Sequence, residues 1–295
     1  MKNGFLLILI LFLCYNSIYA AEEKAAPSMG LSVQPGGLLI QQVKLGETYD
    51  LEEKSGITLL IENKDDLPHT YKITTFKPSA VGNKKWLKGY LEIPDPAWFW
   101  FDKDEVTVPP QSREKVRMYF KIPQEEKYYN QHWTISLGIA GSAEKGEMLT
   151  LAVYPRYQLE TESQSGLQET PDGTCGIVPS TVIFKDLTSG TKQKNIVTIY
   201  NNDHNVHKYK ITSQIIAVDK SREQIVPSPG YSWIPEITWL KTNKRTLKIK
   251  PGKRAELIVT INIPKKSIDV NKKWEALIFI EPDEGRARFM RIKLE

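Results

Sequence analysis

The sequence contains the same unit twice. The segment from Gly89 to Ile139 matches the segment from Gly230 to Ile280 at a constant offset of 141 residues, without a gap. Upstream, the match continues at offsets of 138 and then 144 residues. Matched pairs include Trp98/Trp239, Trp133/Trp274, Pro94/Pro235, Pro123/Pro264, Asn63/Asn201, His69/His207, Gly46/Gly190 and Pro35/Pro179. Residues kept in both copies are expected to build the fold, whereas residues found in one copy are free for a local function.

The first twenty residues have the pattern of a secretory signal peptide. Lys2 precedes an apolar run from Phe5 to Leu13, and small residues follow up to Ala20, after which we expect cleavage. The apolar run is too short to span a bilayer, and no second apolar stretch follows. We therefore expect an exported protein, periplasmic or extracellular at the cell surface, without a transmembrane segment in the mature chain.

Cysteine content predicts a chain without internal disulfides. Once Cys14 is removed with the signal peptide, Cys175 alone remains. Despite export, stability must then come from burial of a hydrophobic core, for which each copy is long enough. Cys175 is expected to be a spare thiol, with a cross-link to another chain as the alternative.

Alternating apolar residues predict strands throughout both copies. From Arg113 to Pro123 the residues alternate between an apolar and a polar face, and the second copy repeats the apolar face from Leu257 to Ile263. No segment shows an extended helical period. Seven or so short strands per copy, separated by turn residues, favour an all-β fold in which each copy is an antiparallel two-sheet sandwich. We expect domains at 29–160 and 175–295, with the polar linker 161–174 leaving them some freedom.

The order of these features resembles a known family. A proline precedes the first strand, a second strand ends in Asn-x-Asp-Asp, Tyr-x-Ile begins the return, and an alternating strand ends in Ile-Pro before a tryptophan and a hairpin. This order resembles bacterial immunoglobulin-like domains related to the major-sperm-protein and pilus-chaperone sandwiches. The resemblance covers both copies and implies two tandem immunoglobulin-like domains, but a fold of this kind hosts many functions.

Periplasmic pilus chaperones are also exported pairs of such domains, which provides a second functional hypothesis. The resemblance implies an Arg on the first strand, a Lys on the last strand of the first domain, and a long last strand lent to a subunit by strand addition. Here the first strand, Gly30 to Ile40, has no Arg. The last strand, Met148 to Tyr154, alternates as required, but it lacks a Lys and ends at Pro155.

Charge differs between the two copies. From Glu22 to Glu162 there are 17 Lys and Arg residues against 21 Asp and Glu, and from Ser163 to Glu295 there are 22 against 14. The stretch from Lys241 to Arg254 is strongly basic, and it is a candidate surface for an acidic polysaccharide, a cell-wall polymer or lipid head groups. Its candidate cations are Lys241, Lys244, Arg245, Lys248, Lys250 and Lys253. The alternative is a solvated strand face. We expect no nucleic-acid partner.

Aromatic residues that occur in the first copy alone are a second candidate surface. Trp98 and Phe99 have apolar counterparts in the second copy, whereas the following rings do not. The copy-specific rings are Trp86, Trp100, Phe101, Tyr128 and Tyr129. Gathered on the surface, they would form an adhesive or sugar-stacking patch. Alternatively, they cover a longer loop, Lys77 to Lys88, against the sheet.

Motifs for catalysis or metal binding are missing from the sequence. His204 and His207 have a spacing open to metal binding, but no cysteine lies near them, and His207 has a repeat partner in His69. Nucleophile motifs, phosphate-binding loops and paired carboxylates are not found. We therefore expect no enzyme, metal or cofactor. The sequence favours an exported binding or structural protein of the cell envelope that contacts a protein or a polysaccharide; the alternative is a pilus-chaperone-like protein that donates an edge strand.

Overall fold

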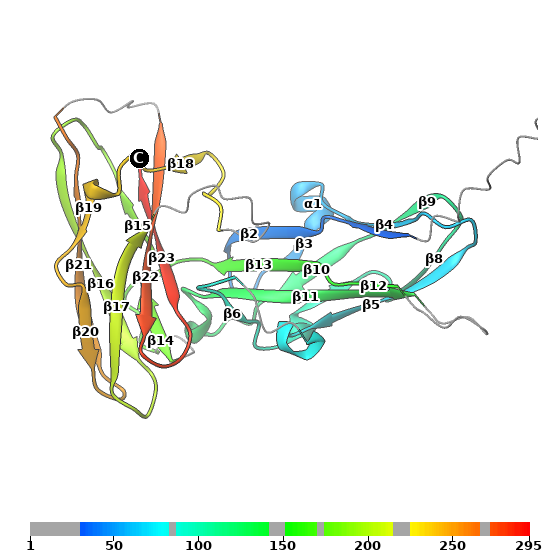
Figure 1. Cartoon of the computed structure of the whole chain (residues 1–295), viewed down its shortest axis with the longest axis horizontal. Helices are drawn as coiled ribbons and strands as arrows, with labels where there is room; N and C mark the ends of the chain where they lie inside the picture. Colours follow the sequence, from blue (N-terminus) through cyan, green and yellow to red (C-terminus); the bar gives the residue numbers. More distant parts are fainter. Residues whose placement is uncertain (1–29, 83–86, 142–150, 170–173, 215–224, 266–271) are drawn as a thin grey trace, which may run out of the picture.

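The computed structural model describes residues 30–82, 87–141, 151–169, 174–214, 225–265 and 272–295. The expected signal peptide and Trp86 lie outside these ranges. The described chain forms two β-sandwiches, with the strands of the second running across those of the first (Figure 1). Within these ranges, no helix reaches the length and apolarity needed to cross a membrane.

The first sandwich is built from residues between Leu31 and Thr161. Its strands are β1 (Leu31–Gln34), β2 (Gly37–Val43), β3 (Thr48–Asp50), β4 (Leu59–Asn63), β5 (His69–Phe76), β6 (Leu91–Glu92), β7 (Phe99–Phe101), β8 (Glu105–Val108), β9 (Ser112–Val116), β10 (Met118–Lys121), β11 (His132–Gly141), β12 (Ala152–Val153) and β13 (Arg156–Thr161). One α-helix, α1 (Leu51–Ser55), and three 3₁₀ turns, η1 (Pro78–Val81), η2 (Pro96–Trp98) and η3 (Glu126–Tyr128), complete it.

One layer of this sandwich is the sheet β2-β13-β11-β5-β8, to which β6 and β12 add by pairing with β11. The other strands form two short sheets, β1-β4-β9 and β3-β10-β7. The predicted alternating strand from Arg113 to Pro123 is thus divided into β9 and β10. It is interrupted at Arg117, whose N–H donates to the Asp102 carboxylate at 2.8 Å.

The second sandwich repeats the plan with longer strands. These are β14 (Cys175–Val178), β15 (Thr181–Phe184), β16 (Lys192–Asn201), β17 (His207–Gln214), β18 (Tyr231–Trp233), β19 (Leu240–Thr242), β20 (Thr246–Ile249), β21 (Arg254–Asn262), β22 (Lys273–Pro282) and β23 (Arg288–Leu294), with the 3₁₀ turn η4 (Ile237–Trp239). Its sheets are β14-β16-β21-β19 and β15-β23-β22-β17-β20, with β18 beside β22.

Helix α1 explains the change of repeat offset. Between Gly46 and Asn63 the first copy is six residues longer than the second, because the offset falls there from 144 to 138. In the first copy α1 fills this interval, and the Asp50 carboxylate caps it by accepting from the backbone N–H groups of Glu52 and Glu53 at 3.0 and 3.2 Å. In the second copy β16 runs through without a break.

The all-β prediction of two sandwiches is confirmed, with one correction to the strand pairing. Most neighbouring strands are antiparallel, but β2 pairs in parallel with β13, and β15 pairs in parallel with β23. The short strands β6 and β18 also pair in parallel, with β11 and β22. In each copy the first strand pairs with one sheet, the chain turns at Pro35 or Pro179, and the next strand joins the other sheet. A strand that changes layer in this way necessarily meets one neighbour in the parallel sense.

Each sandwich has its own apolar core, and a third apolar cluster lies between them. The third cluster comprises Tyr90 from the first sandwich with Ile225, Leu277, Phe279 and Phe289 from the second. This cluster gives the two sandwiches a shared apolar contact, whose burial favours their docked arrangement. The linker also adheres to the first sandwich: Asn130 donates its side-chain amide to the Gln164 carbonyl at 2.8 Å.

Candidate binding edge and the junction between the sandwiches

The last strand of the first sandwich has a free edge. Among the described strands β12 pairs with β11 alone. The Gly141 N–H donates to the Leu151 carbonyl at 3.0 Å, and the Leu137 N–H donates to the Pro155 carbonyl at 2.9 Å. Successive backbone groups along a strand point to opposite sides. The N–H and C=O groups of Ala152 and Tyr154 therefore point away from β11, toward the free edge.

This free edge ends where β2 begins to cover the sheet. From Gly37, opposite Arg156, to Ile40, opposite Leu159, β2 pairs with β13. Before Gly37 the chain has crossed to the other layer, where β1 pairs with β4. On this side, none of the described strands pairs with the segment 151–154, and its side chains Leu151 and Tyr154 are 43% and 48% exposed.

A pocket of about 480 Å³ lies beside this edge, between the two sandwiches. Tyr154, Arg156 and Gln158 line it from the last strand of the first sandwich, and Leu38 and Leu39 line it from β2. Ile225 and Val226 close it from the second sandwich. The pocket combines an apolar wall with a guanidinium and an amide, which suits it to hold a side chain or a chain end of a bound segment.

Buried charges join the sandwiches next to this pocket. Glu160 on β13 accepts two hydrogen bonds from the Arg291 guanidinium on β23, both at 2.6 Å. Arg291 also pairs with Glu275, and the Tyr90 hydroxyl donates to Glu160. Burial raises the pKa of the Glu160 carboxyl, but the Arg291 charge outweighs it, so the pKa lies below its usual range.

An aromatic contact completes the junction. The Phe289 ring stacks on His132 with centroids 4.1 Å apart and lies 5.3 Å from the Tyr90 ring. Gly89, at φ +95°, leaves room for this ring, because a Cβ there would clash with Phe289. Burial lowers the pKa of His132 to about 3, so its ring is neutral at ordinary pH.

The second sandwich shows how the same edge is covered. Ile139 and Ile280 occupy equivalent repeat positions and pair with Val153 and Arg288, respectively. Arg288 forms a parallel bridge with Gly89 of the first sandwich. Backbone from the first sandwich therefore covers in the second the edge that is free in the first.

Three of the copy-specific aromatic residues lie in the body of the first sandwich. Tyr128 is 7% exposed and packs against Trp98 and Trp133, with ring centroids 5.0 and 5.7 Å apart. Phe101 and Tyr129 are half-buried against the same core. For Tyr128 the surface interpretation fails, because the ring is enclosed by other rings. Trp100 is 39% exposed and stacks on Tyr119, with centroids 5.9 Å apart.

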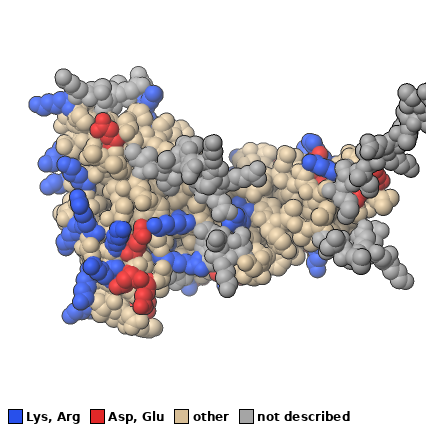
Figure 2. Space-filling view, viewed as in Figure 1, with Lys and Arg blue, Asp and Glu red and all other residues tan. Residues whose placement is uncertain are grey.

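The candidate basic residues are all exposed but do not form one patch. Lys241 and Arg245 line a groove between β17 and β19, together with Lys208 and Lys210. Lys248 and Lys250 lie on or just after β20, and Lys253 borders a separate hollow with Gly252 and Arg254. Lys244 precedes β20. Figure 2 shows Lys and Arg side chains gathered over the second sandwich.

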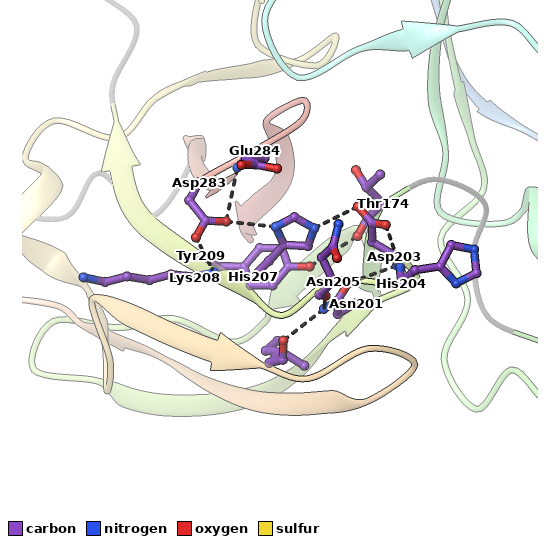
Figure 3. Close-up of polar contacts among 11 residues, drawn as sticks. Thr174, Asn201, Asp203, His204, Asn205, His207, Lys208, Tyr209, Asp283 and Glu284 are labelled. Carbon is purple, nitrogen blue, oxygen red and sulfur yellow. Dashed lines mark hydrogen bonds and ion pairs between the residues drawn. The ribbon is translucent and has the colours of Figure 1, made fainter.

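The repeated histidines each bind a turn of their own copy. His69 contacts Asp65, and His207 contacts Asp203, both through Nε2 at 2.8 Å. Figure 3 shows His207 between two carboxylates, since its Nδ1 also lies 2.9 Å from Asp283. The hydrogen bonds to Asp203 and Asp283 raise the pKa of His207. His204 points away from this ring (Figure 3), so the two histidines do not converge.

The last strand of the first sandwich continues beyond Pro155, which the sequence pattern did not predict. Arg156 and Gln158 continue the strand in the same sheet, although a proline was expected to end it. Pro155 is tolerated because its carbonyl still accepts from Leu137. A polar-apolar alternation from Arg156 to Leu159 was the available signal.

Comparisons with known proteins find similarity to solved structures only. No protein-family model matches the chain, and no curated protein matches it. A protein of unknown function from Porphyromonas gingivalis is 13% identical, with 90% of this chain and 99% of that chain covered and a TM-score of 0.34. The E. coli chaperone DraB is 10% identical, with 90% and 98% covered and a TM-score of 0.32. A PapD-like domain of human CEP192 is 14% identical, with 56% and 99% covered and a TM-score of 0.34.

Proposed function

We propose that this chain is an exported, non-catalytic binding protein of the cell envelope that pairs an extended segment of a partner protein with the free edge of β12, as a chaperone does. The observation that carries the proposal is the outer edge of the segment 151–154, with which no described strand pairs and whose outward backbone groups lie beside a pocket. Export rests on the expected signal peptide.

Strand addition fits this geometry in two respects. The outward N–H and C=O groups of Ala152 and Tyr154 offer main-chain hydrogen bonds, which supply affinity without regard to sequence. The adjoining pocket, with Arg156 and Gln158 among its lining residues, offers selection of one side chain or chain end. The bridge between Gly89 and Arg288 supports the proposal, because backbone of this chain already pairs with the equivalent edge at one residue.

The test removes one outward donor and leaves the sandwich's own pairing intact. Ala152→Pro deletes an N–H that points to the free edge, whereas the inward bonds of Leu151 and Pro155 to β11 stay. Glu105→Pro is the matched control: it lies on the opposite edge strand, β8, of the same sheet. Its N–H also points outward, because Ile73 bonds to the neighbouring Asp104 carbonyl.

Each protein, beginning at Ala21, is used to capture partners from an envelope extract of the producing cells. We expect one partner to be retained by the unaltered chain and by Glu105→Pro and lost by Ala152→Pro, with circular dichroism unchanged. In the complex, hydrogen exchange at Ala152 and Tyr154 should slow. Equal retention by both variants, or exchange that does not slow, rejects the proposal. So does sedimentation showing that a second copy of the chain occupies the edge.

A further inference from the structure

The second sandwich has an open groove at one side. The groove has a volume of about 1030 Å³ and lies between the outer edge of β17 in one sheet and β19 in the other. The β17–β20 pairing reaches Lys210, opposite Thr246, and the Ile211 N–H still donates to the Arg245 carbonyl at 2.9 Å. Beyond this point, no described strand covers β17 on this side.

The first sandwich shows why this groove is open. Thr242 on β19 is the repeat equivalent of Phe101 on β7, and the two pair with the equivalent residues Val259 and Met118. The Phe101 ring packs on Phe99 with centroids 5.8 Å apart and belongs to the margin of the core. In the second copy a threonine replaces that ring, so the space beside Leu240 is left to solvent.

The charge at this position also differs between the copies. Four exposed cations line the groove: Lys208, Lys210, Lys241 and Arg245. Their counterparts in the first copy are Thr70, Lys72, Trp100 and Asp104. Lys208 also lies directly opposite Lys248 across the β17–β20 pair. Like charges at such a position destabilise a sheet, so their presence favours an external anion.

The carboxylates of the groove already have partners. Asp283 is held by His207 at 2.9 Å and by the Lys208 N–H at 3.1 Å. Glu281 pairs with Lys88 of the first sandwich at 2.7 Å. The four lining cations, by contrast, form no ion pair with a carboxylate among the described residues. The groove therefore presents positive charge that the described chain does not neutralise.

We infer that this groove binds an acidic polysaccharide through its carboxylate groups. Four cations on β17, on β19 and just before β20 give the groove a positive field, which attracts a chain with repeated negative charges. Hydroxyl side chains lie between them, on Thr212, Ser213 and Thr246, and these suit the hydroxyls of a sugar. Aliphatic Ile237 and Leu240 form an apolar floor for the C–H faces of sugar rings. A concave site of this kind fits a chain, whereas a lipid surface requires a flat or convex face.

The experiment measures binding of polygalacturonate, with dextran as the neutral polymer and poly-glutamate as the acidic peptide. The test variants are Thr242→Phe, which restores the ring of the first copy without changing charge, and the double variant K241E/R245E. The matched control is K192E/K194E, an equal charge change at exposed positions on β16, outside the groove. Thr242→Phe is expected to fold, because the first copy already accommodates this ring.

We expect the unaltered chain to bind polygalacturonate and not dextran, with weaker binding as salt increases. Thr242→Phe and K241E/R245E should each weaken binding roughly tenfold or more, while the control pair stays within about twofold. The inference is overturned if the control pair loses as much as the groove pair, if Thr242→Phe binds normally, or if poly-glutamate binds as tightly. Ala152→Pro should bind polygalacturonate unchanged, so this inference and the proposed strand pairing fail independently.

Discussion

Arg291 of the second sandwich and Glu160 of the first form a bidentate ion pair across the junction, with the Arg291 Nε and Nη2 atoms each 2.6 Å from a Glu160 oxygen. Their side chains are 1% and 5% exposed. Such a pair offsets the desolvation of its charges only while both members are present. The junction between the sandwiches consequently depends on residues 131 positions apart in the sequence.

We predict that Arg291→Met destabilises the protein by about 3–5 kcal/mol, because Glu160 and Glu275 would remain buried without their cation. Urea unfolding measures the loss. Arg113→Met is the control, since Arg113 pairs with Glu62 at the surface and exposed ion pairs contribute little. Similar unfolding curves for the two variants would show that the buried pair does not hold the junction.

Gly89 and Gly230 provide a second test of the junction. They are repeat equivalents with φ of +95° and +82°, so alanine strains the backbone in both, at a cost of about 1–2 kcal/mol. A Cβ at Gly89 also meets Phe289, whereas a Cβ at Gly230 has nothing within 4 Å. We predict that Gly89→Ala is clearly the more destabilising in urea and that it alone increases the radius of gyration in X-ray scattering. Equal effects would mean that Phe289 moves aside freely.

The sandwiches themselves could be predicted from the sequence because the repeat and the alternation report local geometry. Asn63 and Asn201 illustrate this: each buried amide donates to a carbonyl four residues on, at 2.7 Å. The same turn forms in both copies because the same asparagine amide holds it. The same comparison located the six-residue insertion, although the short helix that fills it has too few residues to show a helical period.

The junction and the free edge could not be predicted in the same way. Glu160, Arg288 and Arg291 are charged residues in alternating strands, a pattern that predicts exposure. All three are buried, and Arg288 and Arg291 bond to side chains of the first sandwich. Tyr90 and Tyr231 have the same role in their own copies, since each hydroxyl donates to a glutamate at the end of its sheet, Glu160 or Glu295. The two copies differ because Glu160 also binds Arg291 of the other sandwich. Only the packing of the two sandwiches reveals this contact.

Cys175 should be chemically silent in the folded protein. Its thiol is free and 1% exposed within the core of the second sandwich, and burial raises its pKa to about 12. Because the thiolate is the reactive form, we predict no labelling by iodoacetamide at pH 8 in buffer and complete labelling in urea. Rapid labelling without denaturant, or a disulfide-linked dimer on a non-reducing gel, would contradict this placement.

The pH dependence of stability should reveal His132. The folded chain holds this ring neutral down to about pH 3, whereas in the unfolded chain it takes a proton near its ordinary pKa of 6.5. Between these values the unfolded state binds more protons than the folded state. The contribution of His132 to stability is therefore full above pH 6.5 and falls as the pH decreases.

The groups facing the His132 ring are Glu160, Arg288 and Arg291, which keep their charges above pH 5. We predict that His132 contributes a loss of about 2 kcal/mol between pH 7 and pH 5, whereas His207, whose folded pKa is raised, acts in the opposite sense. His132→Phe should remove the His132 contribution, since phenylalanine preserves the stack on Phe289. The exposed His204→Gln should retain the full loss in urea unfolding. If His132→Phe shows the same pH slope as the unaltered chain, the ring is protonated within the fold and the junction is wetter than its packing indicates.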